Sequence, residues 1–128
     1  MKKILFFLII FIFFNGCKKD NSLNYSSSLI GEWSWLRTCG GFVGCIGPED
    51  EHSTNSIVFT TDSICNCYQN DTLRSSTRFH THKLFSIDGK DSVNVIIYDS
   101  DGSLNFSITH DTLGLYNSIF SSIYKRIN

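Results

Sequence analysis

Short segments rich in Ile, Val, Phe, Tyr and Thr recur along the chain at intervals of about ten residues, and Gly, Asn, Asp and Ser separate them. Apolar and polar residues alternate most regularly in residues 92–98 and 103–109. Because successive side chains of a strand point to opposite faces, such segments have one dry face and one wet face. The chain has no Ala, and its one Met is the first residue, so two strong helix formers are missing. The pattern predicts an all-β fold.

Eight strands are predicted, and together they favour an antiparallel up-and-down barrel. The turns at residues 88–90 and 99–102 contain the Asp and Gly residues that tight reversals require. Closing eight strands removes exposed sheet edges and encloses room for side chains or one small ligand. Residues 40–55, with Pro48 and the acidic run 49–51, are predicted to form an irregular surface loop. The predicted strands are residues 30–38, 56–61, 64–69, 77–87, 92–98, 103–109, 112–116 and 119–127.

The N-terminus has the three parts of a secretory signal. Two Lys residues precede eleven apolar residues, 4–14, and Asn15, Gly16 and Cys17 follow. Eleven helical residues rise only ~16 Å against a hydrocarbon core of ~30 Å, so a membrane-spanning helix is disfavoured. A small residue directly before Cys resembles the lipobox of bacterial lipoproteins, although Phe14 and Asn15 differ from its usual residues. The alternative is an ordinary cleaved signal in which Cys17 has no role.

The lipobox resemblance implies a lipid anchor. Residues 1–16 would be a removable lipoprotein signal peptide, and Cys17 would carry diacylglycerol and a fatty acyl chain such as palmitate. Residues 17–28, rich in Ser, Asn and Lys, are predicted to be a lipidated flexible tether before a barrel domain at residues 29–128. In lipoproteins of this type, a Lys directly after the lipidated Cys implies the outer membrane. The predicted location is therefore the cell envelope, with the membrane as a partner.

A second resemblance lies at the two ends of the predicted barrel. Gly31-Glu32-Trp33 resembles the Gly-x-Trp signature that opens lipocalin and related calycin barrels. The chain is similar to small lipocalin-like (calycin-type) lipoproteins of Bacteroidetes-type bacteria in the order of residues 29–35, 40–44, Pro48, Phe59, 111–115 and 124–127. The resemblance implies that Trp33 packs at the closed end and that a basic residue, Arg126 or alternatively Lys125, lies across its ring. Such a cation–π contact contributes ~0.5–2 kcal/mol.

Four cysteines remain besides Cys17, and an even number in an exported chain predicts disulfides. One of the three connectivities includes a bond between Cys65 and Cys67, whose Cα atoms on an extended strand approach ~7 Å apart, a poor disulfide geometry. The other two join residues near the 40–55 segment to the third strand. Pairing Cys39 with Cys67 and Cys45 with Cys65 is slightly preferred. If Cys39 pairs with Cys45 instead, Cys65 and Cys67 stay reduced or form a strained bond.

A competing interpretation of the cysteines is a metal site. Cys65 and Cys67 on one strand, and His80 and His82 on another, each alternate onto one strand face. Two thiolates and two imidazoles suit zinc or copper. The spacing is not C-x-x-C, however, and two histidines with Thr81 and Lys83 as neighbours are typical of a solvated face. We therefore expect no metal and no other cofactor, and we expect the remaining histidines to be turn residues, namely His52 and His110.

The sequence contains no G-x-S-x-G, no H-E-x-x-H and no phosphate loop followed by a helix, so we predict that the protein is not an enzyme. With eleven Lys and Arg against twelve Asp and Glu and no basic cluster, nucleic acid is not an expected partner. The first hypothesis is a monomeric barrel that binds a small, partly apolar molecule, with residues 40–55 at its mouth. The predicted wall of that site is Phe59, Phe79, Phe85, Val95, Ile97, Phe106 and Leu115.

The second hypothesis is a structural or protein-interaction module of the envelope-inhibitor type, with a filled barrel and no ligand. The volume of any cavity distinguishes the two. A pocket above ~300 Å³ favours ligand binding, whereas a packed interior favours the interaction module.

Overall fold

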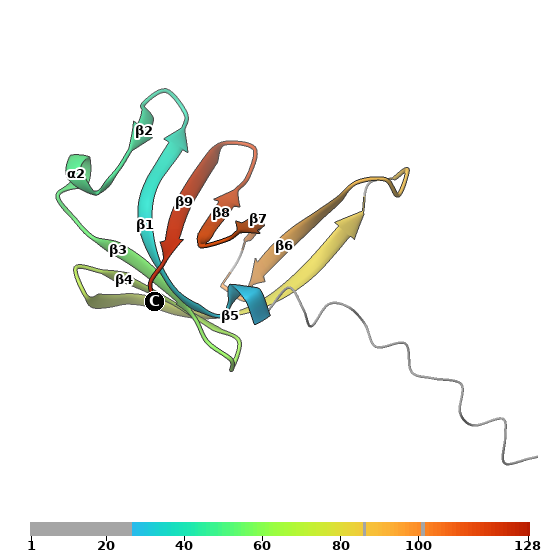
Figure 1. The fold of residues 1–128 in the computed structure, drawn as a ribbon, viewed down its shortest axis with the longest axis horizontal. Coiled ribbons are helices and arrows are strands. Elements are labelled where there is room, and N and C mark those ends of the chain that lie inside the picture. Colours follow the sequence, from blue (N-terminus) through green and yellow to red (C-terminus); the bar gives the residue numbers. More distant parts are fainter. Residues whose placement is uncertain (1–26, 86, 101) are drawn as a thin grey trace, which may run out of the picture.

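The computed structural model describes residues 27–85, 87–100 and 102–128, which form one antiparallel sheet (Figure 1). Each wall strand pairs with the next, and the first also pairs with the last, which closes the sheet into a barrel. The predicted all-β, eight-stranded up-and-down barrel is confirmed for these residues, and it is consistent with a lipocalin-like fold. The wall strands are β1 (Gly31–Gly40), β3 (Asn55–Phe59), β4 (Ile64–Gln69), β5 (Thr72–Phe85), β6 (Ser92–Tyr98), β7 (Ser103–Thr109), β8 (Thr112–Tyr116) and β9 (Phe120–Arg126).

Most strand boundaries follow the predicted ones. Four strands, β4, β6, β7 and β8, have the predicted bounds, and β1, β3 and β9 agree with theirs to within two residues. β5 differs, because it begins at Thr72 rather than at residue 77. Asn70 and Asp71 have φ angles of 49° and 61°, the geometry of a two-residue hairpin turn, so β5 pairs with β4 at once. Residues 72–76 contain one apolar residue, Leu73, and so show no alternation from which this early start could be predicted.

The prediction that residues 40–55 form an irregular loop is wrong, because this segment contains two regular elements. β2 (Gly44–Ile46) pairs with the end of β1, and the short helix α2 (Pro48–Glu51) follows it. Gly41 and Gly44 have positive φ, which permits the tight reversal between β1 and β2. Pro48 opens the helix, where its fixed φ is favourable and its missing N–H would have no intrahelical partner.

The closed end of the barrel is built around Trp33, which is fully buried. Residues 27–29 form one helical turn, and the side chain of Leu29 is buried in the same core. Trp33 Nε1 donates a hydrogen bond of 2.9 Å to the Leu29 carbonyl oxygen, so the buried indole N–H has a partner. The turn before β1 therefore caps the core at this end.

Arg126 covers the Trp33 ring. Its guanidinium carbon lies 4.1 Å from the ring centre, and its nitrogens donate to the carbonyl oxygens of Ile30 and Ser28. The structure thus brings Trp33 and Arg126 together as the lipocalin resemblance implies. Gly31 has a φ of +135°, and a Cβ atom at this position would lie 2.7 Å from Arg126 Nη1. The glycine of the Gly-x-Trp motif therefore leaves room for the cation that covers the tryptophan.

The face of β6 that packs against the core is opposite to the predicted one. Ile96 is buried in the core and pairs with Leu104, which packs against that core. Val95 and Ile97 alternate with Ile96 and stand opposite the two histidines of β5, so they lie on the face away from the core cluster, although Val95 is itself only 5% exposed. Their predicted inward position is therefore wrong. Three consecutive apolar residues make the alternation ambiguous at this point, and pairing with β7 decides it.

Replacing Arg126 with Ala should lower the free energy of unfolding by about 1–3 kcal/mol, because the ring contact and two hydrogen bonds to backbone carbonyls are lost together. Urea denaturation followed by tryptophan fluorescence measures the change. The matched control is Lys125→Ala, since Lys125 is the exposed neighbour on β9. Equal losses in the two variants would contradict the role given to Arg126.

Candidate ligand-binding site

Four wall strands place side chains on one interior face beyond the closed end. On β1, Trp35 occupies the next inward position after Trp33 and pairs with Tyr124 of β9. On β3, Ile57 pairs with Trp33 on one side and with Cys67 of β4 on the other. Because directly opposed residues of antiparallel strands share a face, these side chains all project into the barrel.

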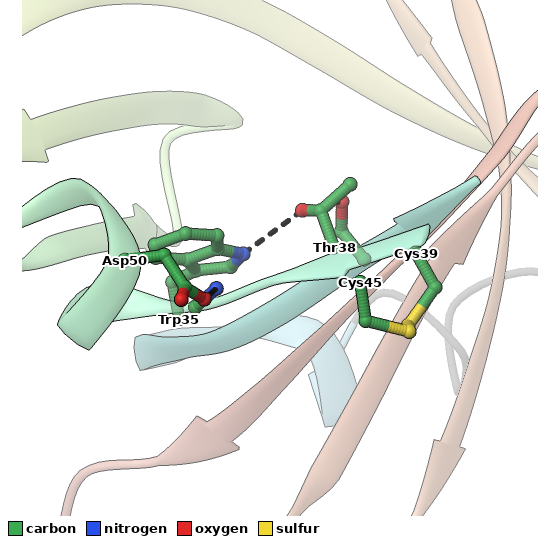
Figure 2. Close-up of a disulfide and its surroundings, with 7 residues drawn as sticks. Trp35, Thr38, Cys39, Cys45 and Asp50 are labelled. Atoms are coloured by element: carbon green, nitrogen blue, oxygen red, sulfur yellow. Dashed lines mark hydrogen bonds between the residues drawn. A yellow bond between two sulfur atoms is a disulfide. The ribbon is translucent and has the colours of Figure 1, made fainter. Parts of the chain in front are cut away.

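A bulge in β1 determines the arrangement at the open end of this face. The register with β9 shifts between Trp35 and Arg37, and the extra residue, Leu36, is exposed. After the bulge, Thr38 pairs with the buried Ser122 and again faces inward. Trp35 Nε1 donates to the Thr38 hydroxyl at 2.9 Å (Figure 2), and the Thr38 and Ser122 hydroxyls lie 2.7 Å apart. These hydrogen bonds fix the orientation of the Trp35 ring.

A cleft of about 510 Å³ opens beside the Trp35 ring. Its walls combine aromatic and aliphatic side chains with a few polar and charged ones, which is the usual composition of a small-molecule site. Residues 46, 51 and 55, from the segment expected at the barrel mouth, are among those that line it. The full lining is Trp35, Thr38, Ile46, Glu51, Asn55, Ser56, Ile57, Cys67, Tyr68, Gln69, Arg74 and Tyr124.

The wall residues predicted from the sequence do not line this cleft. Phe85 is 66% exposed at the end of β5. Val95, which is buried, and Ile97 lie on the face of β6 away from the core cluster. Sequence reasoning missed Trp35 and Tyr124, although the position of Trp35 two residues after the motif tryptophan places both rings on one strand face. The other four predicted wall residues are buried in the packed core, namely Phe59, Phe79, Phe106 and Leu115.

A disulfide joins Cys39 to Cys45 across the hairpin of β1 and β2, where the two residues are directly opposed (Figure 2). The preferred pairing of Cys39 with Cys67 and of Cys45 with Cys65 is therefore wrong. The bulge in β1 gives the physical reason. Cys39 follows the inward-facing Thr38 and so faces outward, whereas Cys65 and Cys67 face the interior and remain free.

The two free thiols lie side by side on the inward face of β4. Cys65 is 2% exposed, whereas Cys67 is half-buried and lines the cleft. Interaction with Cys67 and burial both raise the pKa of Cys65, because the Cys65 thiol donates its proton toward Cys67. The same interaction lowers the pKa of Cys67 to about 6. The Ser75 hydroxyl contributes to the lower pKa of Cys67, against the effect of burial. Burial raises the pKa of Tyr98 strongly and that of Tyr124 to about 12, so both neighbouring hydroxyls stay protonated at neutral pH.

The alternative set of two cysteines and two histidines is not assembled. Both cysteines face the interior, whereas His80 and His82 lie on the outer face of β5 with their ring centres 5.3 Å apart. Within residues 27–85, 87–100 and 102–128, no three His, Cys, Asp or Glu side chains are grouped as ligands of one metal ion. His52 ends α2 and His110 lies between β7 and β8, both with positive φ.

Comparisons with protein-family models, with curated proteins and with solved structures gave no match. In the part of the chain that the structure describes, no helix has the length and apolar character needed to cross a membrane. The predicted signal peptide at residues 1–16, Cys17, and the tether up to residue 26 lie outside the described residues. Ser27 and Ser28, assigned to the tether from the sequence, belong to the helical turn before β1.

Cys67 should react with iodoacetamide faster than Cys65, because it lines the cleft and is the more acidic thiol. The rate should rise with pH through about 6, where Cys67 becomes a thiolate, and level off above that pH. Replacing Cys65 with Ala removes the thiol donor and should move the midpoint toward the ordinary cysteine value of ~8.5. Peptide mass mapping after timed alkylation measures each rate. Faster labelling of Cys65, or an unchanged midpoint in Cys65→Ala, would contradict this assignment.

Proposed function

We propose that this chain is a membrane-anchored, lipocalin-like lipoprotein that binds a small, partly apolar molecule at the cell envelope and catalyses no reaction. The observation that carries the proposal is the cleft of about 510 Å³ beside Trp35 and Tyr124. Its volume exceeds the ~300 Å³ at which small-molecule pockets begin, and the mouth of a β-barrel is a frequent place for such pockets. A barrel with a cleft of this size favours ligand binding over a purely structural role.

The lining residues indicate the chemistry of the ligand. Trp35, Tyr68 and Tyr124 offer aromatic surface, against which a flat or aliphatic body gains ~25 cal/mol for each Å² of apolar area buried. Glu51 and Arg74 also line the cleft, and their charges can orient a polar end group. The ligand that fits this lining has an apolar body and a polar or charged end.

The packed core limits how deeply a ligand can enter. Trp33, Phe59 and Cys65 are each at most 2% exposed, so the interior next to the cleft is already filled by side chains. Protein cores of this kind are packed as densely as organic crystals and leave little free volume. A ligand would therefore stay in the cleft and be compact, rather than extend through the barrel as a long acyl chain would.

The anchor in this proposal is supported by the sequence. Gly16 followed by Cys17 ends an apolar leader in the manner of bacterial lipoproteins, and Lys18 favours the outer membrane. The ten residues from Cys17 to the helical turn at residue 27 span at most roughly 35 Å when fully extended. An anchor at Cys17 would therefore keep the cleft close to the membrane surface, where partly apolar molecules concentrate.

An anionic apolar dye, 1-anilinonaphthalene-8-sulfonate, should bind the folded protein with saturable one-to-one stoichiometry. Its rings would contact the aromatic wall and its sulfonate would meet Arg74. Tyr68→Ala and Arg74→Ala should each weaken binding by about tenfold, equivalent to ~1.4 kcal/mol, because each removes one part of that recognition. Fluorescence titration gives the dissociation constants. The control is Phe85→Ala, an exposed apolar residue distant from the cleft lining. Weakening by Phe85→Ala alone would contradict binding in the cleft.

Replacing Cys17 with Ser should move the protein from the membrane pellet to the soluble fraction, because the anchoring acyl chains are lost. Cell fractionation without detergent, followed by immunoblotting, measures the distribution. The matched control is the double variant Cys39→Ser and Cys45→Ser, which removes the disulfide but leaves the anchor. Continued pelleting of Cys17→Ser would contradict lipid anchoring at this residue.

One observation favours the second candidate, a protein-interaction module. β6 pairs with β7 only over residues 94–97, so the far ends of β5 and β6 extend beyond the barrel as a two-stranded ribbon (Figure 1). This ribbon carries four exposed apolar residues, Leu84, Phe85, Ile87 and Val93. Exposed apolar groups gathered on one projection are typical of protein-binding surfaces. Absence of dye binding to the folded protein would favour this candidate over ligand binding.

A further inference from the structure

We propose that Cys65 and Cys67 form a metal site inside the barrel, which binds one Cu(I) ion between two thiolates. Both cysteines are free and face the same interior, and no function described above uses them as a pair. The inference depends on neither the apolar ligand nor the lipid anchor.

The geometry of β4 suits two-coordinate binding. Residues two apart on a strand project from the same face with Cα atoms ~6.6 Å apart. Metal–thiolate bonds of ~2.3 Å require the two sulfurs of a linear site to lie ~4.6 Å apart. Both thiols are free and project from β4 into the same interior, so rotation of the two side chains can bring their sulfurs from the wider Cα spacing to that separation.

The number and softness of the ligands select the metal. Thiolates are soft donors, which favour Cu(I) and Zn(II) over Mg(II) or Ca(II). Zn(II) takes four ligands in structural sites, but the described residues group no third His, Cys, Asp or Glu with these two cysteines. His80 and His82 cannot complete such a set, because they lie on the outer face of β5. Two thiolates alone therefore match Cu(I), which is stable with two ligands.

The residues around the two cysteines exclude water on one side and leave a path for the ion on the other. Phe59 stands opposite Cys65 on β3, and Ile57 stands opposite Cys67, so apolar side chains flank the pair. Cys67 lines the cleft and so gives an ion a path from solvent. Binding releases to solvent each proton that the two cysteines still carry, and the resulting complex of Cu(I) with two thiolates carries one negative charge. Arg74 lines the same cleft, and its positive charge can offset that charge.

The cysteine pairing of the structure preserves this dithiol. Cys39 and Cys45 are bonded to each other on the outer face, and neither can reach the interior to oxidise Cys65 or Cys67. Alternate residues on an extended strand place their Cα atoms near the upper limit of disulfide geometry, which disfavours a direct bond between Cys65 and Cys67. The pair can therefore remain reduced in an exported protein.

The full-length protein, purified under nitrogen, should take up one equivalent of Cu(I) per chain from its complex with the colorimetric chelator bicinchoninate. Cys65→Ser and Cys67→Ser should each weaken Cu(I) binding at least 100-fold, since one thiolate cannot hold the ion alone. The matched control is the double variant His80→Ala and His82→Ala, which should bind Cu(I) as the unaltered protein does. X-ray absorption at the copper edge should show two sulfur neighbours.

Folding of the serine variants is checked by near-ultraviolet circular dichroism. The unaltered protein, methylthiolated at Cys67 with methyl methanethiosulfonate, gives a second test that needs no substitution and should also fail to take up Cu(I). Unchanged uptake in either serine variant, or loss of uptake in the histidine variant, would overturn the site. One equivalent of Zn(II) bound as tightly as Cu(I) would overturn the choice of metal. A bond between Cys65 and Cys67 in the native protein, found by mass analysis without reductant, would overturn the dithiol itself.

Discussion

The contact between Arg126 and Trp33 joins the last wall strand to the first, and the closed barrel depends on that junction. The guanidinium lies against the indole face and donates to two backbone carbonyls that precede β1, so one side chain ties both strands to the turn before them. Gly31 makes this approach possible, because any larger residue would meet the guanidinium. Pairing of β1 with β9 gives both ends of the barrel wall a partner, whereas β2 and the β5–β6 ribbon each keep an unpaired edge. Closure thereby supplies a rigid wall for the interior.

The interior of the barrel is divided between a packed part and an open part. Around Trp33 and Phe59 the side chains are packed as in any protein core, and they leave no room for a ligand. Beyond Trp35 the side chains separate. The bulge at Leu36 turns Thr38 inward, where its hydroxyl joins Trp35 and Ser122 in a chain of hydrogen bonds that holds the Trp35 ring in place. The disulfide holds β2 against the end of β1 above this point. The fold thus combines a stabilising core with a preformed cleft, which reduces the ordering cost of binding.

The sequence was sufficient to predict most wall strands, but not β2, the start of β5 or the faces on which particular side chains lie. Strands with strict alternation, such as β7, could be predicted to the residue because their period is unambiguous. In β6, the run Val95-Ile96-Ile97 satisfies either face, and only pairing with β7 decides between them. The disulfide pairing was not predictable, because it depends on the bulge at Leu36, which turns Cys39 outward. The cleft could not be predicted either, because its lining residues come from several strands and from α2, which are distant from one another in sequence.

Cys67 connects the two proposed sites, and this sharing has a thermodynamic consequence. Its thiol lines the cleft that would hold the apolar ligand, and it is also one of the two ligands proposed for Cu(I). Binding of the ion would convert the free Cys67 side chain into a metal-bound thiolate in the wall of the cleft, which Arg74 also lines. By linkage, any change that the ion makes in the affinity for the ligand is matched by an equal change that the ligand makes in the affinity for the ion. Because Cys67 is already a thiolate at neutral pH, the complex adds no charge beside Arg74, so the coupling would come from contact between the ion and the ligand in the cleft wall rather than from competition for the guanidinium.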